Sequence, residues 1–309
     1  MRNQVIERHL KWQHTQIHTE MGKLFTTIFL LLASMGIASA AGGALPLHPE
    51  SIFGDDSIFF WITDSMVMVW IAAVLIYFFC RAATKKMTMV PSGFQNFSEW
   101  LIEALYDFFE KILGAHLVKR TFWFFGSTFL LILTVNYLAL IPGVGTVGTQ
   151  SADGAHFRGF LRGGNADLNM TAAMSLTFAI LWFYWALTEN SVKQFFSHIF
   201  APKGDFKGAM LAVMVGIFFI VGILEMISIA IRPVALSFRL FGNIYGGEQT
   251  LGGLMDLVPY DWMRFLPALP FTFMELLVGL IQALVFTLLS AVFLKLICDH
   301  GDHDEEGAH

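Results

Sequence analysis

Several ionisable residues of this sequence stand inside long apolar stretches, where an uncompensated charge is costly. Between residues 209 and 248 such residues are Glu225, Arg232, Arg239 and Glu248, joined by the amide of Asn243. An arginine at the centre of a membrane helix costs about 2.5–3.5 kcal/mol on insertion scales. Residues placed there against such a cost are candidates for moving ions or protons, because a fixed positive charge beside carboxyl groups suits that chemistry.

The spacing of these residues predicts a single polar face on one helix. Glu225, Arg232 and Arg239 follow one another at intervals of seven residues, which is about two helical turns. Asn243 lies four residues after Arg239 and joins the same face. Pro233 should kink this helix or remove one of its backbone hydrogen bonds.

A second polar stripe falls in the last apolar segment. Glu275 and Gln282 are also seven residues apart, so they share a helix face. We expect the two stripes to face each other or a shared aqueous path. Structural roles remain open beside the functional one: Arg232 could snorkel to the membrane interface, and Glu225 could pair with one of the arginines.

Five segments are long and apolar enough to position these residues within a bilayer. Each contains about 20 or more mostly apolar residues and must be helical in lipid, where backbone groups find no water. The five predicted spans are roughly 58–80, 121–141, 171–190, 209–240 and 271–297. Residues 92–115 alternate apolar and acidic side chains at helical spacing, which predicts an amphipathic helix lying on the membrane. The glycine-rich loop 142–170 is expected to be irregular.

Composition supports the same fold class, an all-α membrane protein with five transmembrane helices and one interfacial helix. Of the 309 residues, 56% are hydrophobic and only 14% are charged, against about 25% in ordinary soluble domains. The net charge of −5 comes without a basic run, so no nucleic-acid partner is expected. Cys80 and Cys298 form no metal-binding pattern, and neither a metal nor a cofactor is predicted.

The N-terminus carries the features of a secretory signal peptide. In residues 21–40, Lys23 precedes an apolar run, and Ala38-Ser39-Ala40 provides a small-residue cleavage site. Residues 1–20 are either a long polar n-region or precede the true start at Met21, and an uncleaved anchor is the minority alternative. Cleavage would leave the mature N-terminus outside.

Basic residues in the loops predict the orientation. Loops 81–120 and 191–208 carry most of the lysines and arginines between the spans. Positive charge favours the cytoplasmic side, so these loops and the C-terminus are expected inside, which agrees with the signal peptide.

The stretch RPVALSFRLFGNIYGGE, from Arg232 to Glu248, resembles the hallmark of subunit a of F-type ATP synthases. GLIQALVF at 279–286, ADLNMT at 166–171 and ITDS at 62–65 resemble other segments of that family. The resemblance covers roughly residues 57–298 and implies a non-catalytic proton-channel subunit in the bacterial inner membrane. It leaves residues 1–40 as an extension with a signal peptide, 41–56 as a periplasmic segment and 299–309 as an acidic cytoplasmic tail.

The resemblance also implies roles for individual residues on the proton path. Arg239 corresponds to the arginine that faces a rotating ring of c subunits, and Gln282 to a glutamine near it. Asn243 corresponds to an asparagine lining the path, and Glu225 to a glutamate on the cytoplasmic access route. Proton movement through two half-channels would then turn the ring and drive ATP synthesis elsewhere in the complex.

For the outer half-channel the resemblance implies a relay between Glu248 and Glu275. Many bacterial members have histidine at the position of Glu275, so two carboxylates here are a departure from the family pattern. Arg232 stands where lysine is frequent. Asp64 and Asp167 lie in the matching motifs and are secondary candidates.

The implied partners are the c-subunit ring, the b subunits of the peripheral stalk, the remaining ATP synthase subunits, the lipid bilayer and the translocated H⁺. Sodium coupling remains open, since the c subunit largely decides the ion. An unrelated multi-pass transporter or channel would also bury charges, but would not explain RLFGN followed by the glutamate and the glutamine. A structural scaffold needs no arginine at mid-membrane, and the sequence has no nucleophile elbow, P-loop or HExxH motif of an enzyme.

Overall fold

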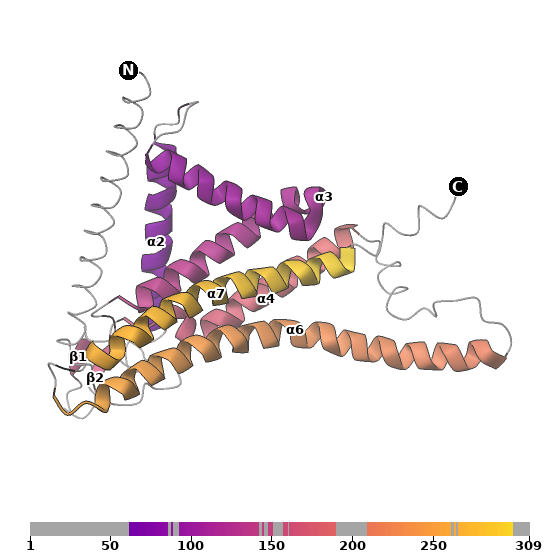
Figure 1. Ribbon diagram of the computed structural model, residues 1–309. Helices are drawn as coiled ribbons and strands as arrows, with labels where there is room; N and C mark the ends of the chain where they lie inside the picture. Colours follow the sequence, from indigo (N-terminus) through magenta and orange to yellow (C-terminus); the bar gives the residue numbers. More distant parts are fainter. Residues whose placement is uncertain are drawn as a thin grey trace, which may run out of the picture.

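The computed structural model describes residues 62–85, 88, 93–141, 144, 148–150, 157–159, 161–189, 209–260, 263 and 265–298. The predicted signal peptide, periplasmic segment and acidic tail lie outside these residues. Five long helices dominate the described part, and each is long and apolar enough to cross a membrane (Figure 1). They are α2 (Asp64–Thr84), α3 (Phe94–Ala139), α4 (Leu168–Glu189), α6 (Ala209–Asp256) and α7 (Phe265–Cys298).

The helix ends differ from the predicted spans for local reasons. Helix α2 begins at Asp64 because the hydroxyl of Thr63 caps it, accepting a hydrogen bond from the backbone N–H of Met66 at 3.4 Å. It continues past residue 80 to Thr84, since Arg81 near the C-terminal end complements the helix dipole. Helix α6 likewise continues through Pro233 and beyond residue 240 to Asp256.

Helix α3 joins two elements that the sequence predicted separately. Its limbs, 94–113 and 115–139, meet at Gly114, whose φ of 82° and ψ of 161° interrupt the helical backbone. Only glycine adopts such a positive φ without strain. The chain therefore turns back at this point, and the two limbs diverge from it (Figure 1), packing together near the bend, where Phe109 stacks on Phe125. The predicted amphipathic segment is helical, and its place on the membrane surface stays a prediction.

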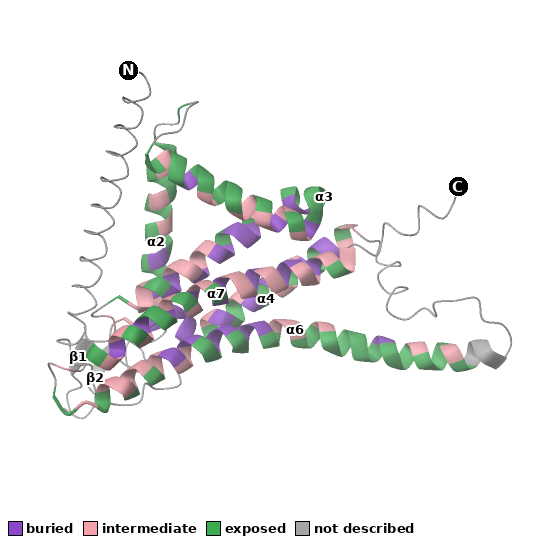
Figure 2. Ribbon diagram, in the orientation of Figure 1, coloured by how far each residue is buried: buried purple, intermediate pink, exposed green. Residues whose placement is uncertain are grey.

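The core lies among the second limb of α3, α4, the C-terminal half of α6 and α7. Aromatic rings fill much of it: Phe124 stacks on Phe178, and Trp185 packs edge-on against Phe124. Helix α2 and the N-terminal half of α6 remain mostly exposed (Figure 2). Large apolar side chains such as Phe78, Ile220 and Leu224 are about 60% exposed, as expected for surfaces that face lipid or another subunit.

The described parts of the loop 142–170 are more regular than predicted. Strands β1 (Gly148–Gln150) and β2 (Phe157–Gly159) form an antiparallel pair in which Thr149 lies opposite Arg158. The 3₁₀ turn η1 (Gly164–Ala166) then leads into α4. The expectation of an irregular loop was wrong here, because paired strands and a turn satisfy backbone groups that glycine-rich composition alone does not reveal. Turn η1 contacts α2, α3, α4 and α6, and so brings the loop into the bundle.

Candidate functional site

Polar side chains are buried together where α2, α3, α6, α7 and η1 meet. This buried polar cluster occupies the interior of an otherwise apolar bundle, where each polar group needs a partner. Its members are the buried Asp64, Ser65, Asn136, Arg162, Asn165, Asp167 and Glu275, together with the half-buried Glu248, whose Oε2 atom is buried.

The first part of the cluster connects α2 to the start of α4. The hydroxyl of Ser65 donates a hydrogen bond to Asp167 Oδ2 at 2.6 Å. Asp167 Oδ1 accepts from the backbone N–H of Asn169 at 2.9 Å, which caps α4, and Asp64 Oδ1 accepts from the backbone N–H of Ser65 at 2.7 Å. The two secondary candidates, Asp64 and Asp167, therefore belong to one hydrogen-bonded group.

The second part is a pair of asparagines that sequence reasoning missed. Asn165 Nδ2 donates to Asn136 Oδ1 at 2.7 Å, and Asn136 Nδ2 donates to the Gly279 carbonyl at 3.0 Å. The chain of bonds thus links η1, α3 and α7. A polar residue inside an apolar run was the available signal for Asn136, and the flank of the ADLNMT motif was the signal for Asn165 and Arg162.

The structure brings the two predicted relay carboxylates, Glu248 of α6 and Glu275 of α7, into this cluster. Glu248 accepts a hydrogen bond from the backbone N–H of Gly163 and interacts electrostatically with Arg162, Asp64 and Glu275. Glu275 is buried, with 6% of its surface exposed. Within the described part of the chain, Glu248 Oε2 and Glu275 Oε1 are buried atoms without a hydrogen-bond partner.

Arg239 lies on the other side of α6 from Glu248. Nine residues separate them, which is two and a half turns and hence opposite faces of the helix, about 13 Å apart along its axis. The Arg239 side chain is exposed, and among the described residues it forms no ion pair. A fixed positive charge is therefore presented on an exposed face of α6, away from the buried polar cluster.

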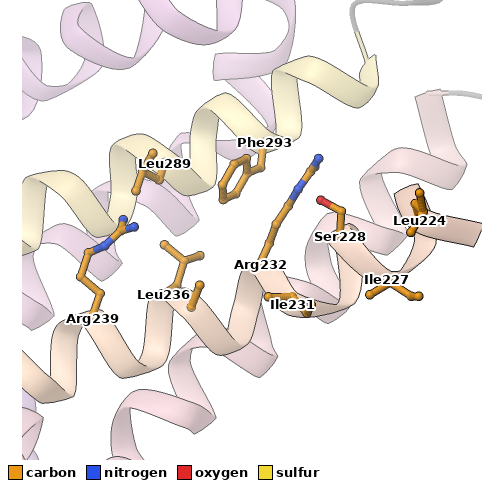
Figure 3. Close-up of a pocket in the computed structure, with 10 residues that line it drawn as sticks. Leu224, Ile227, Ser228, Ile231, Arg232, Leu236, Arg239, Leu289 and Phe293 are labelled. Atoms are coloured by element: carbon orange, nitrogen blue, oxygen red, sulfur yellow. The ribbon is translucent and has the colours of Figure 1, made fainter. Parts of the chain in front are cut away.

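The arginine face of α6 borders a groove against α7. This groove, with a volume of about 390 Å³, contains both Arg232 and Arg239, and its apolar walls come from both helices (Figure 3). The Arg232 guanidinium lies 4.9 Å from the ring centroid of Phe293, a cation–π contact that accounts for its half-buried position. The groove is lined by Leu224, Ile227, Ser228, Ile231, Arg232, Ala235, Leu236, Arg239, Leu289 and Phe293.

The remaining predicted residues are either exposed on α6 or buried in α7. Glu225 and Asn243 are exposed on α6, whereas Gln282 is buried in α7 with 9% of its surface exposed. In the described part of the chain no ion pair joins Glu225 to Arg232 or Arg239, so the structural pairing considered for it is not formed here. Glu275 and Gln282 of α7 are buried, whereas Arg232 and Arg239 of α6 lie in the groove that α6 forms with α7 (Figure 3).

These features define a multi-pass membrane protein with ionisable groups held inside its helical bundle. Residues 66–295 match the family model described as ATP synthase A chain. ATP synthase subunit a of Solidesulfovibrio magneticus is 30% identical over 239 residues, covering 77% of this chain and 86% of that protein. The corresponding protein of Gloeobacter violaceus is 30% identical over 242 residues, covering 78% and 86%.

A third relative, ATP synthase subunit a of Moorella thermoacetica, is 28% identical over 233 residues, or 75% of this chain and 89% of that protein. The chain belongs to the ATP synthase A chain family. Family membership supports proton translocation in the membrane sector of the F-type ATP synthase, as a channel component rather than a catalytic subunit.

Proposed function

We propose that this chain conducts protons through two half-channels that meet at a ring of c subunits, and that Arg239 separates them. The observation that supports this most is the placement of Arg239 and Glu248 on opposite faces of α6. One face offers an exposed positive charge, and the other faces the buried polar cluster with Glu275. A single helix thus places a positive barrier and a proton relay within about 13 Å along its axis.

Arg239 would act on a carboxyl group carried by each ring subunit. A bare carboxylate facing lipid is costly, so a ring carboxyl must be neutral there. Beside the guanidinium it can be ionised, because an opposite charge stabilises the carboxylate. Arginine suits this position since it does not lose its proton in proteins. A ring subunit therefore has to give up one proton and take another in order to pass Arg239.

The outer half-channel would run through the buried polar cluster. Glu248 and Glu275 would pass the proton toward the ring, and the neighbouring carboxyl, amide and guanidinium groups would keep that route polar. Arg162 supplies a positive charge close to Glu248, which stabilises a carboxylate formed there while the proton moves on. The asparagine pair holds α3, η1 and α7 around the route.

The inner half-channel would lie along the arginine face of α6. Glu225 is exposed on this face, and the groove beside Arg232 contains the hydroxyl-bearing Ser228. Asn243 and Gln282 would line the region close to Arg239. The assignment of Glu225 follows the polar stripe of α6 toward its N-terminal end, and the assignments of Asn243 and Gln282 follow the resemblance to the family.

The same proposal includes the contacts of this chain with other subunits and its orientation in the membrane. The exposed arginine face of α6 would contact the c-ring, the b subunits would bind elsewhere on the bundle, and the complex would lie in the bacterial inner membrane. The basic residues of the loops support a cytoplasmic C-terminus. The first limb of α3 exposes Phe94, Phe97 and Trp100, which suits a helix lying along the membrane surface.

The test is ATP-driven proton uptake by inverted membrane vesicles carrying Arg239→Ala. We expect uptake to be lost while the subunit remains assembled, because the ring carboxylate loses its counter-charge. Arg81→Ala, which removes an exposed arginine from α2, is the matched control and should pump normally. Undiminished pumping by an assembled Arg239→Ala complex would contradict the proposal.

A further inference from the structure

We infer that Gly163 and Gly247 are positioning residues, each leaving the space in which one relay carboxylate lies. The inference rests on the proposed role of Glu248 and Glu275 in the outer half-channel. It adds that the backbone beside each carboxylate must carry no side chain, so that the pair keeps its place in the polar cluster.

Gly247 leaves the space for Glu275. A Cβ atom at Gly247 would overlap the carboxyl carbon and both carboxyl oxygens of Glu275. The carboxyl group of α7 therefore lies directly against the bare backbone of α6. A glycine inside a helix is less favourable than alanine, so a separate requirement is expected at this position. Two nearby glycines of the same helix, Gly246 and Gly252, have open space where a Cβ would stand.

Gly163 leaves the space for Glu248. A Cβ atom there would overlap Glu248 Oε1 and would lie only 3.1 Å from the Ala139 Cβ. The backbone of Gly163 has a φ of −53° and a ψ of 116°, which any residue adopts, so conformation does not require glycine. The same residue donates its backbone N–H to Glu248. It thus provides both the space and a hydrogen-bond donor.

An alanine at either glycine would displace the neighbouring carboxylate and leave the fold unchanged. In both places the first atom that a Cβ meets is the end of a glutamate side chain, which is free to rotate away. By contrast, a Cβ at Gly164 would meet Val69 and Val135, so that glycine serves packing. Gly163 therefore leaves room for the carboxyl group of Glu248, and Gly247 leaves room for that of Glu275. In each pair the glutamate side chain is long enough to fill the space beside the glycine.

The experiment measures passive proton conduction in membrane vesicles from which the catalytic sector has been removed, together with the amount of assembled subunit. Gly247→Ala and Gly163→Ala should each assemble and conduct at least about tenfold less, because displacing a reacting group by about 1 Å can cost 100-fold. Gly252→Ala is the control for adding a methyl group to α6 and should conduct normally.

Rescue by a shorter acid distinguishes positioning from a general structural effect. Glu275→Asp shortens the side chain by one methylene, so Gly247→Ala with Glu275→Asp should conduct better than Gly247→Ala alone. Gly163→Ala with Glu248→Asp should recover in the same way. The crossed combinations, Gly247→Ala with Glu248→Asp and Gly163→Ala with Glu275→Asp, should not recover.

Two variants separate failure of the inference from failure of the proposed function. If Glu248→Gln and Glu275→Gln conduct like the unaltered protein, the relay itself is refuted and the inference falls with it. If both are impaired while Gly163→Ala and Gly247→Ala conduct normally, only the inference is overturned. Equal recovery by the crossed combinations would also overturn it, as would a loss of assembly that the matched aspartate does not restore.

Discussion

At the scale of single residues, the interval between Arg239 and Glu248 decides which surface each side chain faces. Nine residues make two full turns and a half turn, so Arg239 lies on the groove face of α6 and Glu248 on the opposite face, toward Arg162 and Gly163. The charge types and their order could be predicted from the sequence. The partners of Glu248 could not, because Gly163 and Glu275 reach it only through tertiary packing of η1 and α7.

Asn136 is the residue for which the structure makes the clearest stability prediction. Asn136→Leu removes the acceptor for Asn165 and the donor for the Gly279 carbonyl, leaving buried polar groups without these partners. We expect a loss of about 1–3 kcal/mol in the stability of the folded subunit. The midpoint of thermal unfolding of the detergent-purified complex measures it.

Ser127→Ala provides the comparison for Asn136→Leu. Ser127 lies on the same limb of α3, is exposed and bonds only its own helix, to the Phe124 carbonyl at 3.0 Å. The alanine variant should unfold within about 0.5 kcal/mol of the unaltered protein. Equal stability of the Asn136 and Ser127 variants would show that the asparagine bridge contributes nothing.

At the scale of elements, the sequence predicted which segments are helical but not which of them join into one longer helix. Runs of about 20 apolar residues have few alternatives to a helix in lipid, so all five predicted spans have a counterpart. Lys119 and Arg120 ended the apolar run and separated the predicted elements 92–115 and 121–141. A charged side chain on an exposed helix face does not end a helix, whereas the backbone at Gly114 does interrupt it.

The Gly114 joint between the limbs of α3 gives the prediction at this scale. Gly114→Ala places a Cβ on a backbone with a φ of 82°, which costs roughly 1–2 kcal/mol and favours straightening of the helix. We expect less assembled subunit in the membrane and a lower thermal midpoint. Immunoblotting of the assembled complex and a thermal unfolding scan measure the two effects.

Gly216→Ala is the matched control, since Gly216 lies within α6 with an ordinary helical backbone and open space around it. Alanine at that position should be neutral or slightly stabilising. If Gly114→Ala assembles as well as Gly216→Ala, the bend in α3 does not depend on glycine.

At the scale of the whole molecule, the buried core lies on one side of the described bundle. Its core gathers around α3, α4 and α7, whereas the N-terminal half of α6 extends away from them with its apolar side chains exposed (Figures 1 and 2). Helix α2 exposes a second apolar surface. The arginine face of α6 combines apolar side chains with two arginines well inside the helix, which suits a ring of helices bearing carboxyl groups, whereas Arg81 of α2 stands near the end of its helix.

Cross-linking tests which surface meets the ring. Ala235 is exposed in the groove beside Arg239, so a cysteine at this position, in a variant without Cys80 and Cys298, should cross-link to a cysteine placed in the c subunit. A cysteine at Val74, which is also exposed, on α2, should not. Oxidation followed by gel electrophoresis of the subunits gives the readout. Preferential cross-linking from Val74 would move the ring to the other side of the bundle.

The opposite placement of Arg239 and Glu248 on α6 also has an electrical consequence. In the proposed arrangement, water would reach the Glu248 face from outside and the Arg239 face from inside, and the body of a single helix would be the insulator between the two compartments. A helix with its side chains is about 10 Å across, whereas the hydrocarbon layer is about 30 Å thick. The same membrane voltage then falls over roughly a third of the distance, and the field acting on the ring carboxyl beside Arg239 is about three times that of an intact bilayer.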